Sequence, residues 1–216
     1  MVATASTALW YASRATGVVA LVLLTVVVVL GIMVNRQRRL PGLPRFATTG
    51  LHRSMSLLAV AFVAVHVVTA IADPYVTIGI AATLIPFVSA YKPLWLGLGA
   101  LSLDIMAALV ITSLARARIG RRAWRAVHWI GYACWPVALA HSFGSSNDLH
   151  SGGLLVLAIG CAAAVAAAAC WRAASAATAP RKAELAARAL ADAQRPGAGR
   201  AYPPASDRGL TGAGAR

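Results

Sequence analysis

Charged residues are scarce in this sequence, at 12% of the chain, while hydrophobic residues make up 59%. Soluble globular domains usually carry about 25% charged residues, so the composition nearly excludes a soluble domain. The apolar residues also fall into runs close to twenty residues long. Runs of this length span a bilayer core about 30 Å thick.

Five runs have the spanning length, at residues 15–34, 54–72, 94–114, 124–142 and 152–171. A sixth run, residues 78–89, is too short to cross and contains Pro86, so we interpret it as an interfacial or re-entrant segment. No basic region precedes the first run, which we interpret as an uncleaved anchor rather than a signal peptide. The sequence therefore predicts an all-α integral membrane bundle of five transmembrane helices over residues 1–171.

Cysteine is rare too, with 3 residues that lie inside predicted spans without metal-site spacing: Cys134, Cys161 and Cys170. We interpret them as small core residues. Residues 172–216 are basic and rich in Ala, Pro and Gly, and predict a largely disordered tail with one short helix near 184–194. A nucleotide-binding domain needs about 100 residues, and the sequence has no Gly-rich phosphate loop. We therefore expect no FAD or NAD(P) site in this chain.

Basic residues are distributed unevenly about the predicted spans. Eighteen of the 20 fall in the first and third loops and the tail, whereas only Arg14 and Lys92 fall on the other side. The positive-inside rule then predicts a multi-pass protein of the cell membrane with its N-terminus outside and its C-terminus in the cytoplasm. This distribution accounts for the net charge of +14 without nucleic-acid binding, which we do not expect.

Four of the 5 histidines lie in or at the ends of two predicted helices, at depths where polar groups are costly. His52 and His66 are 14 residues apart, which is ~21 Å along a helix and about 40° short of four turns. They therefore share one face. His128 and His141 are 13 residues apart, ~20 Å of rise and about 140° short of four turns, so a straight helix would aim them differently. A kink at Pro136, between them, could correct this.

Both helices are predicted to run from the cytoplasm outward, so His52 matches His128 in depth and His66 matches His141. Such pairs suit two stacked b-type haems, because neutral imidazole is a good axial ligand and a flat apolar macrocycle fits between helices rich in Ala, Val and Leu. A lone intramembrane histidine often only bonds a neighbouring carbonyl. A zinc or copper transport site would need ligands at one level with carboxylates or thiols nearby. Four histidines at two levels favour the haem interpretation.

In these features the sequence resembles the ferric reductase-like transmembrane domain, shared by ferric reductases, NADPH oxidases and the haem-bearing membrane subunit of a bacterial methionine sulfoxide reductase. The resemblance covers roughly residues 10–171 and rests on the two histidine spacings and on the opening Tyr11-Ala-Ser-Arg-Ala-Thr-Gly17. It implies that the four histidines ligate two haems and that electrons pass outward from a cytoplasmic donor. Compared with the oxidases, we expect this chain to lack their additional first helix and their C-terminal FAD and NADPH module, which leaves the electron donor open.

Three arginines are candidate cofactor contacts. Arg14, at the outer end of the first span, could bind a haem propionate or attract an anionic acceptor. The resemblance adds that an arginine of the equivalent oxidase helix stands near the outer haem, although a snorkelling interfacial arginine is the alternative. Arg53 and Arg125 flank the inner pair and could serve its propionates or only set the topology.

Other polar and aromatic residues carry weaker signals. Asp104, midway along the third span, could relay protons or bond a ligand histidine, or be protonated and bonded to a backbone carbonyl. His150 is interpreted as a solvated loop residue. Three aromatic residues between the histidines of the fourth span are expected to pack, and could also shorten an electron path: Trp129, Tyr132 and Trp135.

The predicted function is a b-type cytochrome that moves electrons across the membrane through two bis-histidine haems, as the haem-bearing component of an oxidoreductase. The donor would be a cytoplasmic flavoprotein or a membrane quinol, and the acceptor outside would be ferric iron, oxygen or a partner reductase. The competing hypothesis is a non-redox scaffold or metal-ion transport protein, in which the histidines are structural or bind a mobile ion.

Overall fold

The computed structural model describes residues 2–35, 45–74, 76, 78–146 and 148–194, and these contain helices, turns and loops but no strand. The helices are α1 (Val2–Asn35), α2 (Arg45–Ala72), α3 (Ile80–Leu84), α4 (Pro93–Leu114), α5 (Arg116–Ser145) and α6 (Gly152–Gln194), with a 3-10 turn η1 (Asp148–His150). Helix α4 begins at a proline, which suits the first helical position because its missing N–H would have no partner there.

Four stretches of helix are long and apolar enough to cross a membrane: Thr7–Met33, Phe46–Ala72, Pro93–Leu114 and Gly152–Thr178. Large apolar side chains stay exposed on three of these helices, as at Val68, Ile111 and Val156, whose exposed fractions are 64%, 63% and 69%. Apolar surface of this extent requires an apolar solvent. The chain is therefore an all-helical, multi-pass membrane protein.

The fourth predicted span, residues 124–142, lies within α5 and is helical, but α5 is not among the helices that qualify by length and composition. Its histidines, tryptophans and tyrosine lower its hydropathy, and arginines crowd its first turns. The described part of the chain thus has four apolar spans, and the fifth predicted span is not among them.

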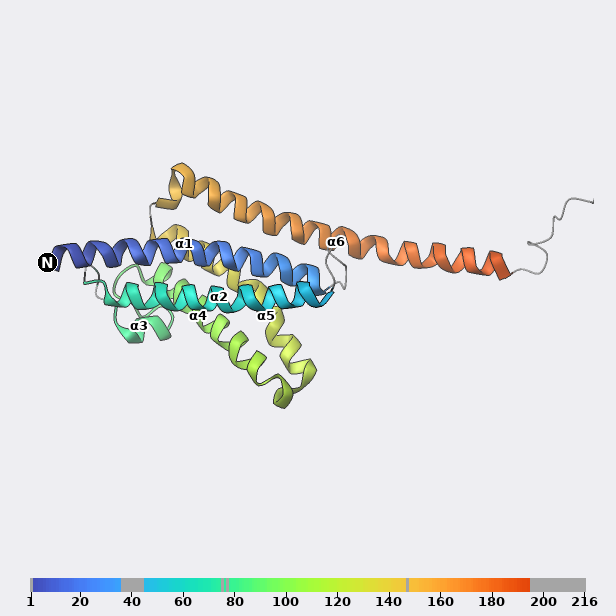
Figure 1. The fold of residues 1–216 in the computed structure, drawn as a ribbon, viewed down its shortest axis with the longest axis horizontal. Coiled ribbons are helices and arrows are strands. Elements are labelled where there is room, and N and C mark those ends of the chain that lie inside the picture. The colour runs from blue at the N-terminus through green and yellow to red at the C-terminus, as the bar shows by residue number, and fades with distance from the viewer. Residues whose placement is uncertain (1, 36–44, 75, 77, 147, 195–216) are drawn as a thin grey trace, which may run out of the picture. The chain divides into compact units, whose positions relative to one another are not determined.

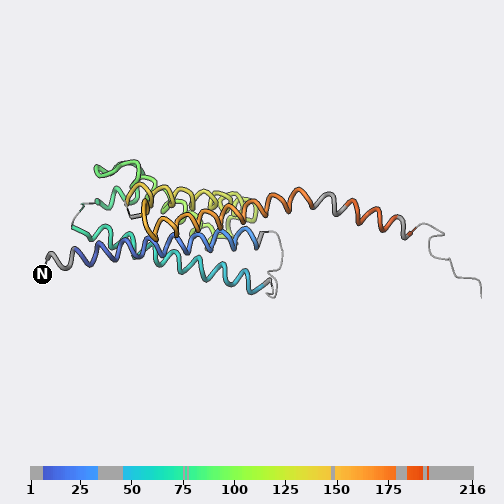
Figure 2. The backbone as a smooth tube through the Cα atoms, turned by 90° about the horizontal axis from the view of Figure 1, so that it is seen from above, coloured from blue at the N-terminus to red at the C-terminus, as the bar shows by residue number. Residues whose placement is uncertain are grey.

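Two helical hairpins position the histidines. Helix α1 packs along α2, and α4 packs along α5 (Figure 1). The tube view from above shows the same two pairs (Figure 2). Helix α1 also touches α5, where the buried Trp135 indole donates a hydrogen bond to the Thr25 hydroxyl at 2.8 Å. A small apolar core at Leu21, Leu149 and Ala158 joins α1, η1 and the first part of α6.

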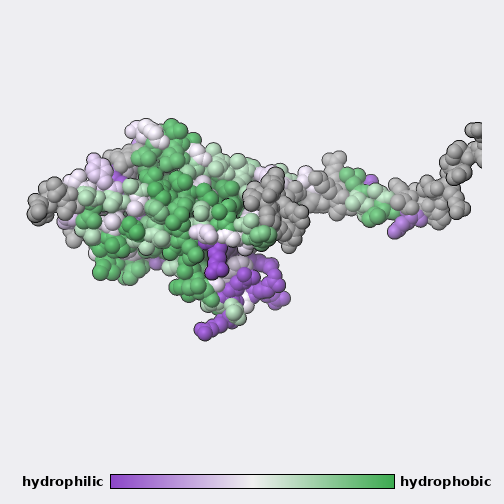
Figure 3. All heavy atoms as spheres, viewed as in Figure 1, coloured by the Kyte–Doolittle hydropathy of each residue, from purple (hydrophilic) through white to green (hydrophobic). Residues whose placement is uncertain are grey.

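The junction between α4 and α5 carries the polar end of this hairpin. Gly120 adopts a φ of 76°, which breaks the helical backbone inside α5 and is a conformation that glycine reaches without strain. Five exposed arginines surround this break: Arg116, Arg118, Arg121, Arg122 and Arg125. Figure 3 shows hydrophilic residues gathered at this junction, next to hydrophobic surface over the helices.

Helix α6 extends further than the sequence predicted. It is continuous to Gln194, so residues 173–183 are helical where we expected disorder. Alanine, the strongest helix former, is abundant in this stretch and outweighs the polar composition. Residues 195–216 of the predicted tail lie outside the described residues. By contacts the chain divides into the units Met1–Cys170 and Trp171–Arg216, and the histidines all belong to the first.

A candidate paired-histidine site

Four of the five histidines meet in two pairs between α2 and α5. The ring centroids of His52 and His128 are 6.4 Å apart, with an angle of 69° between the ring planes. The centroids of His66 and His141 are also 6.4 Å apart, with an angle of 75°. The structure thus brings together the same residues that were matched by depth in the sequence.

The equal separations fit one metal ion between the rings of each pair. A metal–imidazole nitrogen bond is about 2.0–2.1 Å long, and the ring nitrogen lies about 1.1 Å from its centroid, so two rings on opposite sides of one metal have centroids about 6 Å apart. The observed 6.4 Å is close to this value for both pairs. Two imidazoles with no other ligand are the axial donor set of a b-type haem. The residues present therefore fit this group.

Three of the rings lie against glycines on the neighbouring helices. A methyl group added at Gly17 of α1 would be 3.0 Å from the His66 ring, and one at Gly31 would be 3.4 Å from the His52 ring. These glycines are 14 residues apart, as His52 and His66 are. Because α1 runs antiparallel to α2, this equal spacing lets each glycine face one of the two histidines. On α4, a methyl group at Gly99 would be 2.6 Å from the His141 ring. Each helix pair thus makes room for an imidazole where a larger residue would exclude it.

Carbonyl groups orient the rings of the His66–His141 pair. The Nδ1 atom of His66 is 2.7 Å from the Ser13 carbonyl oxygen, and Nδ1 of His141 is 2.8 Å from the Trp95 carbonyl oxygen. The Ser145 hydroxyl lies 3.1 Å from the same His141 nitrogen. A carbonyl only accepts, so each Nδ1 must donate its proton, which leaves the Nε2 lone pair available for a metal.

The His52–His128 pair is held differently. The Nδ1 atoms of both rings are buried without a hydrogen-bond partner, although the Val27 backbone lies near His52 without completing a bond. The Trp124 indole stacks on the His128 ring at 4.7 Å between centroids, and the Arg116 guanidinium lies 4.6 Å from the Trp124 ring on α5. Packing, rather than hydrogen bonding, fixes the orientation of His128.

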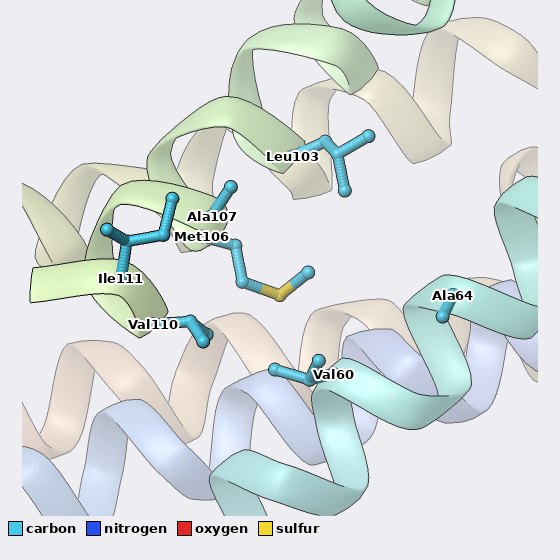
Figure 4. A pocket seen from close by; sticks show the side chains of 7 residues that line it. All are labelled: Val60, Ala64, Leu103, Met106, Ala107, Val110 and Ile111. Carbon is cyan, nitrogen blue, oxygen red and sulfur yellow. The ribbon is translucent and has the colours of Figure 1, made fainter. Parts of the chain in front are cut away.

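An apolar cavity of about 240 Å³ lies between α2 and α4. Its α2 wall, Val60 and Ala64, falls between His52 and His66 in the chain. Figure 4 shows these side chains facing those of α4 across the cavity. The α4 wall is made by five apolar residues: Leu103, Met106, Ala107, Val110 and Ile111. None of the four paired histidines is among the lining residues, so the cavity is a gap in the apolar packing between α2 and α4.

Residues 16–139 match the family described as the ferric reductase like transmembrane component. The chain belongs to this family. The match spans more than half of the 216 residues and includes His52, His66 and His128, but it ends two residues before His141. No curated protein and no solved structure matches the chain. Membership of the ferric reductase-like family confirms the resemblance and associates the chain with transmembrane electron transfer and, as is general in the family, with haem.

The two cations predicted on the outer side both bind the end of α5. Arg14 donates to the Ser146 hydroxyl at 2.9 Å and lies 4.0 Å over the Trp10 ring. The Lys92 ammonium is 3.2 Å from the carbonyl oxygens of Gly144 and of Ser145. Positive charge at a helix C-terminus is favourable, and α5 ends one turn after His141. The role of Lys92 was not foreseen, because its partners are far away in the sequence.

The remaining predicted residues lie away from the facing rings. Arg53 directly follows His52, so it is rotated from it by about 100° on α2. Arg125 lies three residues before His128, about 60° from it on α5, and both arginines are exposed. Trp135 bonds Thr25, which gives it a packing role. The exposed indole of Trp129 packs near Tyr132. His150 is exposed and lies beside Phe143. Asp104 is half-buried on α4.

Proposed function

We propose that this chain is a transmembrane b-type cytochrome, in which His52 and His128 bind one haem and His66 and His141 bind another. The observation that carries the proposal is the equal 6.4 Å separation of both imidazole pairs in a ferric reductase-like chain. Haem supplies reversible one-electron chemistry at its iron. The chain's own groups orient the ligands through the Ser13 and Trp95 carbonyls.

The position of α5 supports a fifth membrane span in this proposal. Its histidines are level with those of α2, and α2 is apolar enough to cross the bilayer. A helix that presents two ligands ~20 Å apart to a spanning helix must itself extend through the apolar layer. The polar residues that lower its hydropathy are largely the haem ligands and the aromatic residues near them.

The cytochrome would act as the membrane component of an oxidoreductase. Electrons would come from a cytoplasmic flavoprotein or a membrane quinol, and would leave to ferric iron, oxygen or a partner reductase outside. We propose that Arg14 binds a propionate of the outer haem or attracts an anionic acceptor, because it lies beside the end of α5 close to His141. We propose that Arg53 and Arg125, which are both exposed, bind the propionates of the inner haem.

The spectrum of the purified chain tests the function. We expect a coloured protein with a reduced-minus-oxidised difference typical of b-type haem and two haems per chain, determined as the pyridine complex against the protein concentration. A colourless chain that is fully inserted and helical after expression with added haem precursor would end the cytochrome proposal.

Labelling of single cysteines tests the orientation. In a variant without the natural cysteines, we expect an impermeant maleimide to label Ser89→Cys in intact cells and to leave Ser206→Cys unlabelled until the cells are opened. The reason is the excess of Lys and Arg on the tail side, which holds that side in the cytoplasm. Labelling of Ser206→Cys in intact cells would reverse the donor and acceptor faces.

A further inference from the structure

Four buried side-chain atoms in the described part of the chain have no hydrogen-bond partner. Two belong to His52 and His128, and the other two belong to residues one helical turn before these histidines. The four atoms are Thr48 Oγ1 and His52 Nδ1 on α2, and Trp124 Nε1 and His128 Nδ1 on α5. Buried polar atoms in folded proteins are nearly always paired, so a cluster of unpaired ones points to a group that the protein itself does not supply.

Thr48 and Trp124 occupy matching places on the two helices. Each lies four residues before a histidine, one turn or ~6 Å toward the N-terminus of its helix. The Trp124 indole is stacked on the His128 ring, which fixes its direction. A separation of four residues also leaves each side chain only about 40° from its histidine around the helix, so Thr48 and Trp124 lie on the histidine-bearing sides of α2 and α5, one turn from the pair.

The chemistry of these two groups selects an acceptor. An indole N–H can only donate a hydrogen bond, and a threonine hydroxyl can donate one as well. The Arg116 guanidinium over the Trp124 ring adds positive charge nearby, so an anionic acceptor is favoured. The sequence has no Asp or Glu in residues 1–72 or 105–147. Neither α2 nor the part of α5 around Trp124 therefore supplies a carboxylate of its own, which favours an anion from a bound molecule.

We propose that Thr48 Oγ1 and Trp124 Nε1 hold a propionate carboxylate of the haem bound by His52 and His128. This inference rests on the proposed cytochrome function and adds two residues without formal charge to the arginines proposed above for the propionates of that haem. The described residues around the His66–His141 pair hold no buried side-chain donor without a partner, and the Nδ1 atoms of that pair donate to the Ser13 and Trp95 carbonyls. The two sites should thus depend differently on these side chains.

The test compares haem with its dimethyl ester, which lacks the carboxylates, in titrations of the haem-free full-length chain in nanodiscs. The variant combines Thr48→Val with Trp124→Phe, which remove the donors and keep the shape and the stacked ring. The control combines Thr25→Val with Trp135→Phe, the same residue types in a pair that is already bonded internally.

We expect the wild type and the control to prefer haem over the ester about tenfold or more at one of the two sites, the range seen when a partner of a bound metal group is lost. In the Thr48→Val, Trp124→Phe variant this preference should fall toward one, while the other site is unchanged. Circular dichroism melting of the haem-free chains checks folding: the variant should be at least as stable as the wild type, and the control less stable.

An unchanged preference in the folded variant would overturn the proposal and leave the two-haem cytochrome standing. The proposal would also be overturned if the wild type bound haem and the ester equally and a lipid phosphate protected Trp124 fluorescence from quenching. The bound anion would then be a lipid headgroup rather than a haem propionate. A wild-type chain that binds neither haem nor ester would instead remove the proposed function.

Discussion

Replacement of His66 or His141 by Ala is expected to remove one haem and leave the other, and the same component of the spectrum should disappear in both variants. His52→Ala and His128→Ala should remove the second component. In the proposed sites each iron would lose one of its two axial ligands, and the fifth histidine, His150, lies beside Phe143 in η1 rather than at either pair. Haem content per chain should fall from two to one, measured with low-temperature difference spectra that resolve the two components.

A matched control is available in the fifth histidine. His150 is exposed in η1 and touches Phe143 rather than another histidine, so His150→Ala should keep both haems. Loss of the same spectral component from His52→Ala and His141→Ala would contradict the pairing, because these rings belong to different pairs.

The histidine pairs were predictable because their spacing repeats within single helices. Spacings of 14 and 13 residues determine rise along any helix, so equal depths follow from the sequence alone. The direction of the His128 and His141 rings did not follow, since 13 residues leave them about 140° apart. Both rings nevertheless reach α2. Helix α5 is inclined to α2 (Figure 1), so the side of α5 that is nearest to α2 changes along its length.

The groups around the rings were missed for a related reason. Gly17, Gly31 and Gly99 matter because of which ring lies opposite on another helix, and a single sequence does not give that register. Gly17 and Gly31 are separated by the same number of residues as His52 and His66. This was a usable signal in the sequence, because residues that face each other on two antiparallel helices have equal spacings. Trp124 was overlooked because its role depends on a stacking contact one turn from His128.

Alanine substitutions at the ring-facing glycines should reduce haem binding in a fixed order. An added methyl group would meet the His141 ring at 2.6 Å from Gly99, the His66 ring at 3.0 Å from Gly17 and the His52 ring at 3.4 Å from Gly31. Only the last is an ordinary contact. Gly99→Ala should therefore cost most of one haem per chain, Gly17→Ala should weaken the same haem, and Gly31→Ala should leave both in place.

Helix propensity acts in the opposite direction and so cannot mimic this result. Alanine stabilises a helix interior by roughly 0.5–1 kcal/mol relative to glycine, which should raise the melting temperature wherever the methyl group has space. Gly160→Ala on α6 is the control, because nothing lies within 4 Å of a methyl group there. It should keep both haems. Haem content is measured at equal protein loading. If Gly99→Ala bound as much haem as Gly160→Ala, the His141 ring would have another position when haem is bound, and the 6.4 Å pairing would not describe the ligated state.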